Sequence, residues 1–253
     1  MMTGDLIVNQ LGGYRFLPGI EPYSCGVAAE SGYEIVHATL ARMLPWHEGL
    51  LAVRKYLEQN GRKRHALCGV ELRCPEPHSF DGFGDFNRDY RLLLEEWQLL
   101  IDSMNPVART NVSPVINPPA ETMLYAFSYT IPSEQPPPTF VIAGGGELRD
   151  GGLGRELIVR VGETSPDAMS EKSQRVVEIM CERLACLGEN DRLSTIDVYT
   201  QHPIRDIVSE VIIPAIPAAA RRGVNWFLTR PPVQEIEFEM DMRGVRQELL
   251  VDL

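Results

Sequence analysis

The feature that most constrains the fold of this chain is a weak internal repeat. An arginine stands nine residues before a Pro-Pro pair at Arg109, and the same arrangement returns 113 positions later at Arg222. An apolar, strand-like run follows each copy, over residues 124–129 and 236–240. A repeat on this scale predicts two related domains in one chain, with functional residues to be compared between the two copies.

The repeat is divided by a segment that is typical of a linker. Residues 131–138 read Ile-Pro-Ser-Glu-Gln-Pro-Pro-Pro, a stiff, polar and proline-rich stretch. We therefore expect a first domain over residues 1–133 and a second domain over residues 134–253. Each of them is long enough to bury a core of its own.

Hydrophobic periodicity and turn residues predict a similar order of strands and helices in both halves. Amphipathic helices are expected at residues 47–60 and 86–100 in the first half, and at 170–187 and 207–220 in the second. The expected strands are 23–29, 34–39, 66–74, 107–115 and 123–130, then 139–143, 156–161, 194–199 and two closing strands. A mixed sheet with two helices on one face is an α+β domain. The other face of each sheet must be covered, which predicts a homo-oligomer.

Composition and charge argue against several classes of function. The net charge of −11 and the pI near 5.0 disfavour nucleic acid and anionic membranes as partners, because a polyanion needs a basic surface. No stretch approaches the length of an apolar membrane span and no signal-peptide pattern is visible, so the cytoplasm is the expected compartment. The five cysteines lack a C-x-x-C pair and the five histidines lack H-x-x-x-H spacing, so no metal is expected.

Four short sequences occur in a characteristic order along the chain. They are Phe-Asn-x-x-Tyr at residues 86–90, the arginine-bearing segments, Phe-Val-Ile-Ala-Gly at 140–144 and Ile-Glu-Phe-Glu at 236–239. Together they resemble the RidA/YjgF family of enamine/imine deaminases, and both halves are similar to one family domain. The resemblance implies two tandem chorismate-mutase-like (RidA-type) domains, each a mixed β-sheet with two helices on one face. It also implies a trimer of two-domain chains with ligand sites in clefts between neighbours.

The functional positions of that family match the two halves unevenly. Arg109 and Arg222 correspond to the arginine that pairs with the substrate carboxylate. The family's water-positioning glutamate lies fifteen residues later, which is Glu237 in the second half and Leu124 in the first. The resemblance therefore favours a working cleft in the second half.

Other family positions are also matched in part. Tyr23 resembles a tyrosine near the N-terminal strand, and Asn87 resembles an asparagine before the second helix, where the second half offers Glu210. The family's Ser-Gly pair becomes His37-Ala38 in one half and Ala143-Gly144 in the other. Because neither half is complete, first-half groups are expected to supplement the second-half cleft across an interface.

The chemistry gives these residues roles. The planar fork of arginine binds a carboxylate bidentately, and one carboxylate can take and return the proton of a hydrolytic water. We therefore predict Arg222 and Glu237 as catalytic residues. The predicted substrate-binding residues are Tyr23, Asn87, Arg109, Gly144 and Trp226.

Each of these residues also has a structural interpretation. Arg109 could form an ordinary ion pair, Arg222 suits the dipole at a helix end, and an asparagine such as Asn87 is often a helix cap. The glycine run 144–146 is more typical of a β-bulge or a turn than of a phosphate loop, because no G-x-G-x-x-G or Lys-Ser/Thr follows. Alternation would place Trp226 on the face of Arg222, where it could line a cleft or pack in a core.

The sequence thus predicts a cofactor-free hydrolytic deaminase acting on a small enamine or imine carboxylate. Two alternatives stay open. One is an enzyme on a cyclic, chorismate-like or aromatic-derived carboxylic acid, since the fused chorismatases resemble this layout. The other is a non-catalytic small-molecule-binding oligomer, which the loss of the glutamate at Leu124 would permit.

Overall fold

The computed structural model describes residues 5–20, 22–135, 138–149, 152–188 and 192–253. Residues 1–4 and the pair Pro136 and Pro137, at the centre of the expected linker, lie outside this part of the chain. Within it, none of the helices has the length and apolar composition that a bilayer span requires.

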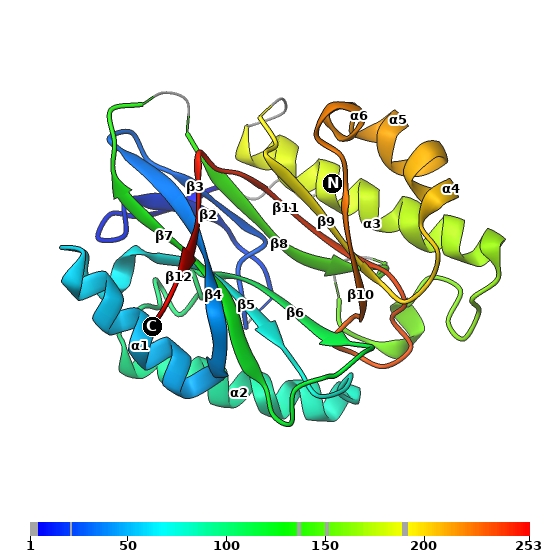
Figure 1. Cartoon of the computed structure of the whole chain (residues 1–253), viewed down its shortest axis with the longest axis horizontal. Helices are drawn as coiled ribbons and strands as arrows, with labels where there is room; N and C mark the ends of the chain where they lie inside the picture. The colour runs from blue at the N-terminus through cyan, green and yellow to red at the C-terminus, as the bar shows by residue number, and fades with distance from the viewer. Residues whose placement is uncertain (1–4, 21, 136–137, 150–151, 189–191) are drawn as a thin grey trace.

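The described residues form one mixed sheet of 12 strands with helices on two sides of it (Figure 1). The order along the sheet is β1-β2-β3-β8-β11-β9-β10-β6-β5-β7-β4-β12. The strands are β1 Ile7–Asn9, β2 Tyr14–Leu17, β3 Gly26–Ala29, β4 Tyr33–Pro45, β5 Leu67–Arg73, β6 Ala108–Pro114, β7 Met123–Pro132, β8 Phe140–Gly146, β9 Thr195–Thr200, β10 Asn225–Arg230, β11 Glu239–Gly244 and β12 Gln247–Val251. This arrangement confirms the α+β class.

The edge strands of the sheet cross the expected domain boundary. Strands β1 to β3 precede residue 133 but extend the second-half strands, because β3 pairs antiparallel with β8. In return, the C-terminal strand β12 pairs in parallel with β4, and Figure 1 shows it in red against the blue strand. Each half therefore completes its part of the sheet with chain from the other half.

The helices of the first half cover one side of the sheet. Helix α1, Trp46–Gln59, buries Leu50, Val53 and Leu57 at helical spacing, as the sequence predicts. Helix α2, Phe80–Glu96, begins six residues before the expected start, because the side chain of Ser79 accepts a hydrogen bond from the Gly82 amide and caps the helix.

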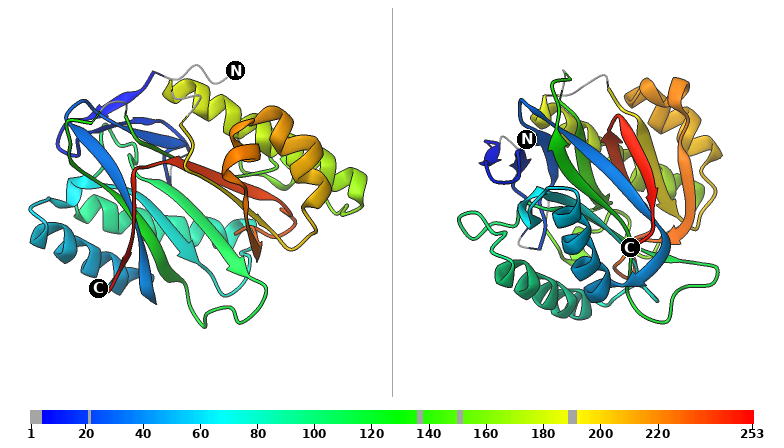
Figure 2. Two further views of the ribbon diagram at one scale, coloured as in Figure 1. Left: turned by 45° about the horizontal axis from the view of Figure 1, so that its top comes forward. Right: turned by 60° about the vertical axis from the view of Figure 1, so that its left-hand side comes forward.

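The helices of the second half pack on the strands of that half, away from α1 and α2 (Figure 2). Helix α3, Pro166–Leu187, is capped by Ser165 and ends at Gly188 in a left-handed conformation. The second expected helix is a series of short segments: α4 Arg205–Ile207, a π-helical turn Val208–Ile212, α5 Ile213–Ala215 and α6 Ala218–Arg222. The strand expected at 156–161 is wrong, because this stretch forms a 3-10 turn, Arg155–Leu157, followed by turn residues.

Each half has its own apolar core between the sheet and its helices. In the first half, side chains of α1 and α2 pack with Val70 and Phe127 of the sheet. In the second half, Met180 of α3 packs with Phe140 and Met242. The two cores lie on the outer faces of the sheet, so the faces that the two halves turn toward each other are free to carry polar groups.

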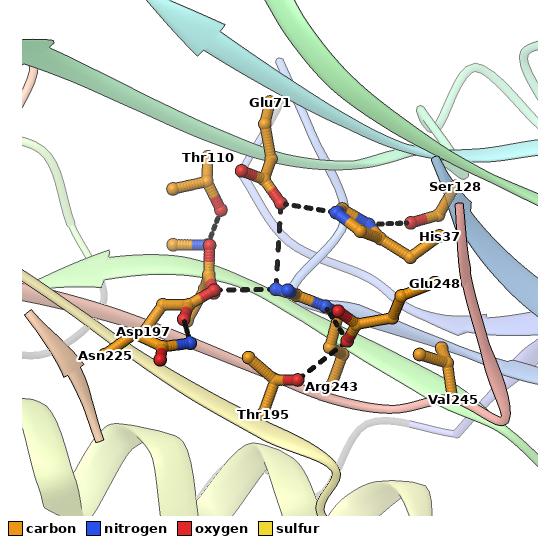
Figure 3. Close-up of polar contacts among 12 residues, drawn as sticks. His37, Glu71, Thr110, Ser128, Thr195, Asp197, Asn225, Arg243, Val245 and Glu248 are labelled. Atoms are coloured by element: carbon orange, nitrogen blue, oxygen red, sulfur yellow. Dashed lines mark hydrogen bonds and ion pairs between the residues drawn. The ribbon is translucent and has the colours of Figure 1, made fainter. Parts of the chain in front are cut away.

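Those inner faces carry a buried ion network centred on Arg243 (Figure 3). The guanidinium of Arg243 lies 2.6 Å from Asp197 and 3.1 Å from Glu248, and 3.9 Å from Glu71 of the first half. Glu71 in turn lies 3.6 Å from the imidazole of His37. Burial lowers the pKa of His37 to about 4, so this imidazole is neutral near pH 7. The network ties the two halves together beneath the site described next.

Candidate active site

The candidate site is built around the buried side chain of Arg109. Strand β6 carries it to a position where it is only 3% exposed. Its Nη2 donates a hydrogen bond to Oδ1 of Asn87, which lies on the buried face of α2. Its Nη1 is buried and has no hydrogen-bond partner among the described residues. A buried, half-paired guanidinium costs free energy unless a ligand completes its hydrogen bonds.

Four aromatic rings surround this guanidinium. The Cζ atom of Arg109 lies 4.6 Å from the ring centre of Tyr90, 5.2 Å from Tyr23, 5.4 Å from Phe86 and 5.8 Å from Phe83. Aromatic faces attract a cation without neutralising it. Burial lowers the pKa of Arg109 from its usual value, but arginine stays charged at any physiological pH.

A protonated carboxyl group faces the same cavity from the second half. Glu239 begins strand β11 and is 5% exposed. Burial raises the pKa of Glu239 to about 8, and the nearby cations of Arg183 and Arg109 oppose that rise only in part. Gly144 makes room for this side chain, because a Cβ at that position would collide with Oε1 of Glu239. The bulge expected in the glycine run is confirmed by the shift of register between β8 and β11.

Arg109 and Glu239 line one small cavity of about 30 Å³. Tyr23, Gly144 and Asn111 line it as well. The side chain of Asn111 is 3% exposed, yet neither its Nδ2 nor its Oδ1 has a hydrogen-bond partner among the described residues. The cavity therefore presents one guanidinium donor, one amide donor and one amide acceptor that await a ligand.

The cavity adjoins a larger hollow of about 740 Å³. The two share four lining residues: Tyr23, Gly146, Leu148 and Leu153. Three arginines line the larger hollow, which are Arg149, Arg175 and Arg183. Glu182 lines it as well, so the hollow carries three cations and one carboxylate beside the small cavity.

Comparison with known proteins identifies the family. Residues 6–249 match the family described as 2-aminomuconate deaminase CnbZ. A relative from Comamonas testosteroni, named 2-amino-5-chloromuconate deaminase, is 40% identical over 257 residues, which cover 98% of this chain and 99% of the relative. This chain belongs to the CnbZ family of deaminases. It is therefore an enzyme that acts on a C–N bond, and the alternative of a non-catalytic binding oligomer is set aside.

Two solved structures show a distant likeness to this CnbZ-family deaminase. A chorismatase is 12% identical with a TM-score of 0.47, over 87% of this chain and 77% of the chorismatase. The YjgF gene product of E. coli is 11% identical with a TM-score of 0.27, over 43% of this chain and 81% of that chain.

The structure brings four of the predicted site residues together. Tyr23, Arg109 and Gly144 line the cavity, and Asn87 holds the guanidinium of Arg109. Tyr23, Asn87 and Arg109 come from the first half and Gly144 from the second, whereas the sequence favoured a cleft built on Arg222 and Glu237 of the second half. Among the described residues, no group of three or more His, Cys, Asp or Glu side chains is arranged to hold a metal ion.

The other three predicted residues lie apart from this cavity. Arg222 is exposed at the end of helix α6, not on the strand that carries Trp226. Trp226 is 47% exposed and its indole N–H donates to the Thr200 carbonyl at 3.0 Å. Glu237 lies 2.9 Å from Nε2 of His202 and lines a different cavity, of about 180 Å³.

Sequence reasoning did not assign Asn111, Glu239 or Arg183 to the site. The signals for two of them were present, because alternation along the expected strands places Asn111 on the face of Arg109 and Glu239 on the face of Glu237. In the structure β11 begins only at Glu239, so Glu237 precedes the strand. The choice between Glu237 and Glu239 needed the position of β11 against β8, which the sequence pattern does not give.

Proposed function

We propose that this CnbZ-family enzyme hydrolyses a 2-aminomuconate-type enamine at the Arg109 cavity, releasing ammonia and a 2-oxo acid. The observation that carries the proposal is the set of unpaired donors and acceptors on Arg109 and Asn111 beside the neutral carboxyl of Glu239. The name of the Comamonas testosteroni relative, a 2-amino-5-chloromuconate deaminase, supports this substrate class.

Arg109 suits the carboxylate that is next to the reacting carbon. Asn87 occupies Nη2, which fixes the orientation of the guanidinium and leaves Nη1 for the ligand. Charge-assisted hydrogen bonds of this kind are about twice as strong as neutral ones, and burial among the aromatic rings strengthens them further. The cavity thus offers a fixed cation to an anionic group.

Asn111 suits the amino group of the same substrate. A 2-amino acid derivative places a carboxylate acceptor and an N–H donor on neighbouring atoms. Nδ2 of Asn111 can donate to the carboxylate while Oδ1 accepts from the amino group, so that both free amide atoms are satisfied. This match distinguishes a 2-amino acid derivative from a simple carboxylic acid.

Glu239 supplies the protons. Its neutral carboxyl donates a proton to the enamine carbon, which converts the C–N bond into an iminium and leaves a carboxylate. The carboxylate then accepts a proton from the water whose oxygen attacks the iminium carbon. In the last step Glu239 protonates the nitrogen and takes the hydroxyl proton, so the C–N bond breaks and ammonia leaves. The balance is enamine plus water to 2-oxo acid plus ammonia.

A pKa of about 8 fits this sequence of steps, because the group is mostly protonated at neutral pH and still able to ionise. Glu239 is also the residue whose side chain Gly144 accommodates. The proposal therefore accounts for three otherwise costly features: a half-paired arginine, an unpaired asparagine and a buried acid.

The tandem RidA-type layout over residues 1–133 and 134–253 remains part of the proposal. Its support is that each segment carries its own helices and that these pack on separate apolar cores, the second of which also includes Leu17, Cys25 and Ala28 of the first segment. The alternative catalytic pair is Arg222 and Glu237, which the sequence predicts. The contact between Glu237 and His202, beside a cavity that Glu237 lines, is the observation in favour of that pair.

Ammonia release from a 2-aminomuconate separates the two assignments. We expect Arg109→Ala and Glu239→Gln to lose about a hundredfold or more of turnover, the usual contribution of a positioned acid or base. Arg222→Ala and Glu237→Gln serve as matched controls and should stay within about threefold of the parent. Loss of turnover in the second pair with retention in the first would refute the assignment to the Arg109 cavity.

A further inference from the structure

We propose that Arg183 is a second carboxylate anchor, so that this enzyme selects substrates with carboxylates at both ends. The inference rests on the proposed function, because it assumes that Arg109 holds the carboxylate next to the reacting carbon. It adds a specificity-determining residue and a reason for the large hollow beside the cavity.

The guanidinium of Arg183 is fixed at the wall of that hollow. Helix α3 carries it, and its Nη1 donates to the carbonyl oxygens of Ala143 at 2.7 Å and Gly144 at 3.2 Å. The absence of a side chain at Gly145 lets the guanidinium lie close to β8, because a Cβ there would stand 3.2 Å from Nη1. Two backbone carbonyls thus orient the fork without neutralising its charge.

Part of the same guanidinium is unused. Its Nε is buried and has no hydrogen-bond partner among the described residues. A buried arginine donor without an acceptor is rare in folded proteins and is typical of a place that a ligand completes. A carboxylate matches the planar arginine fork, because its two oxygens can accept two parallel N–H bonds.

Arg183 stands at the junction of the cavity and the hollow. It lines the hollow, whereas Arg109 lines the cavity, and both cations act on the same two groups, Tyr23 and Glu239. A ligand that extends from the cavity into the hollow therefore meets one arginine at each end. The reacting carbon would lie between them, next to Glu239.

The other two arginines of the hollow are less suited to this role. Arg175 already donates to the Leu148 carbonyl at 3.0 Å and to Glu178 at 3.2 Å. Arg149 is exposed to solvent, where an ion pair is worth little. The protein as a whole carries a net charge of −11, so a dianion needs fixed local cations to be held at all.

The proposal is tested by removing the distal carboxylate of the substrate and the guanidinium of Arg183, separately and together. Kinetics are measured with 2-aminomuconate and with the analogue whose distal carboxylate is an uncharged amide, on the parent, Arg183→Met and the control Arg175→Met. We expect the parent to prefer the dicarboxylate by about 10- to 100-fold in kcat/KM, the value of a charged hydrogen-bonded pair. Arg183→Met should lose this preference, chiefly through KM, and Arg175→Met should keep it.

Arg183→Lys distinguishes the anchor from a mere charge near Glu239. Lysine keeps the positive charge but loses the bidentate fork, so we expect most of the preference to be lost while the pH profile of turnover stays that of the parent. An Arg183→Met enzyme that still prefers the dicarboxylate as the parent does would overturn the proposal.

A binding measurement keeps this result separate from the proposed deamination. Adipate and hexanoate differ only in the second carboxylate, so their affinities can be compared by calorimetry without turnover. Tighter binding of adipate to the parent, lost in Arg183→Met, supports the anchor even if the deamination proposal fails. Equal binding of the two acids to the parent overturns the anchor and leaves the deamination proposal standing.

Discussion

Glutamine in place of Glu239 is expected to remove a pH-dependent part of the free energy of unfolding. The side chain is 5% exposed in the folded protein, and burial raises its pKa from 4.5 to about 8. Below pH 4.5 the carboxyl is neutral in both the folded and the unfolded chain. As pH rises from there, the unfolded chain releases its proton first, so the folded state loses stability until the pH has passed about 8.

The magnitude follows from these two pKa values. With 4.5 for the unfolded chain and about 8 for the folded one, the free energy of unfolding should fall by about 2.7 kcal/mol between pH 6 and pH 9 on account of this group. Glutamine has no proton to release, so the variant lacks this contribution. Relative to the parent, Glu239→Gln should therefore gain stability as the pH rises.

Urea unfolding at several pH values between 6 and 9 measures this difference. The parent, Glu239→Gln and the control Glu237→Gln are compared at each pH, because Glu237 lies two residues away and outside the Arg109 cavity. The difference between the parent and Glu239→Gln should change with pH by about 2.7 kcal/mol, and the control shows what the loss of a carboxylate from the same segment does by itself. A difference that is constant across this range would mean that Glu239 is ionised in the folded protein, which would refute its role as a neutral acid.

Three further predictions concern the packing of the site, the network beneath it and the assembly. Gly144→Ala should lower the rate of deamination at least about tenfold, because the new Cβ would displace the carboxyl group of Glu239. The control Gly84→Ala, whose Cβ would meet open space, should keep the parent rate, and equal rates for the two variants would contradict this prediction. Arg243→Met should cost about 3–5 kcal/mol of unfolding free energy, measured in urea, because it leaves buried carboxylates unpaired, and a loss below about 1 kcal/mol would refute the argument. Light scattering should report a homo-oligomer, with a trimer expected, at a mass well above the 28.4 kDa of one chain. Trp226→Glu on the exposed face of β10 should weaken the association of the chains, and a monomeric parent protein would refute the predicted assembly.

The parts of the fold that follow from local patterns could be predicted from the sequence. Helix α1 and strands β5, β6 and β7 lie close to their expected ranges, because their apolar residues recur with clear periods. Strands β1, β2 and β12 were not expected. Strand β12 pairs with β4, more than a hundred residues away, and strands β1 and β2 are short strands at one edge of the sheet that carry too little pattern to be recognised.

The candidate site, too, could be predicted from the sequence only in part. Arg109 and Asn87 could be found from sequence, and the structure joins them by a hydrogen bond. The acid beside them comes from the other half of the chain, and its identity depends on how β11 aligns with β8. The fifteen-residue spacing pointed to Glu237, whereas the structure places Glu239 in the cavity. A spacing identifies the segment, but β11 begins only at Glu239, so Glu237 precedes the strand and does not share its alternation.

The most direct test of the proposed site is a crystal structure with a non-reactive 2-oxo dicarboxylate bound. We expect one carboxylate within hydrogen-bond distance of Nη1 of Arg109, with Asn111 contacting the same end of the ligand and Glu239 next to the 2-oxo carbon. A ligand bound instead beside His202 and Glu237, with the Arg109 cavity unchanged, would contradict this account.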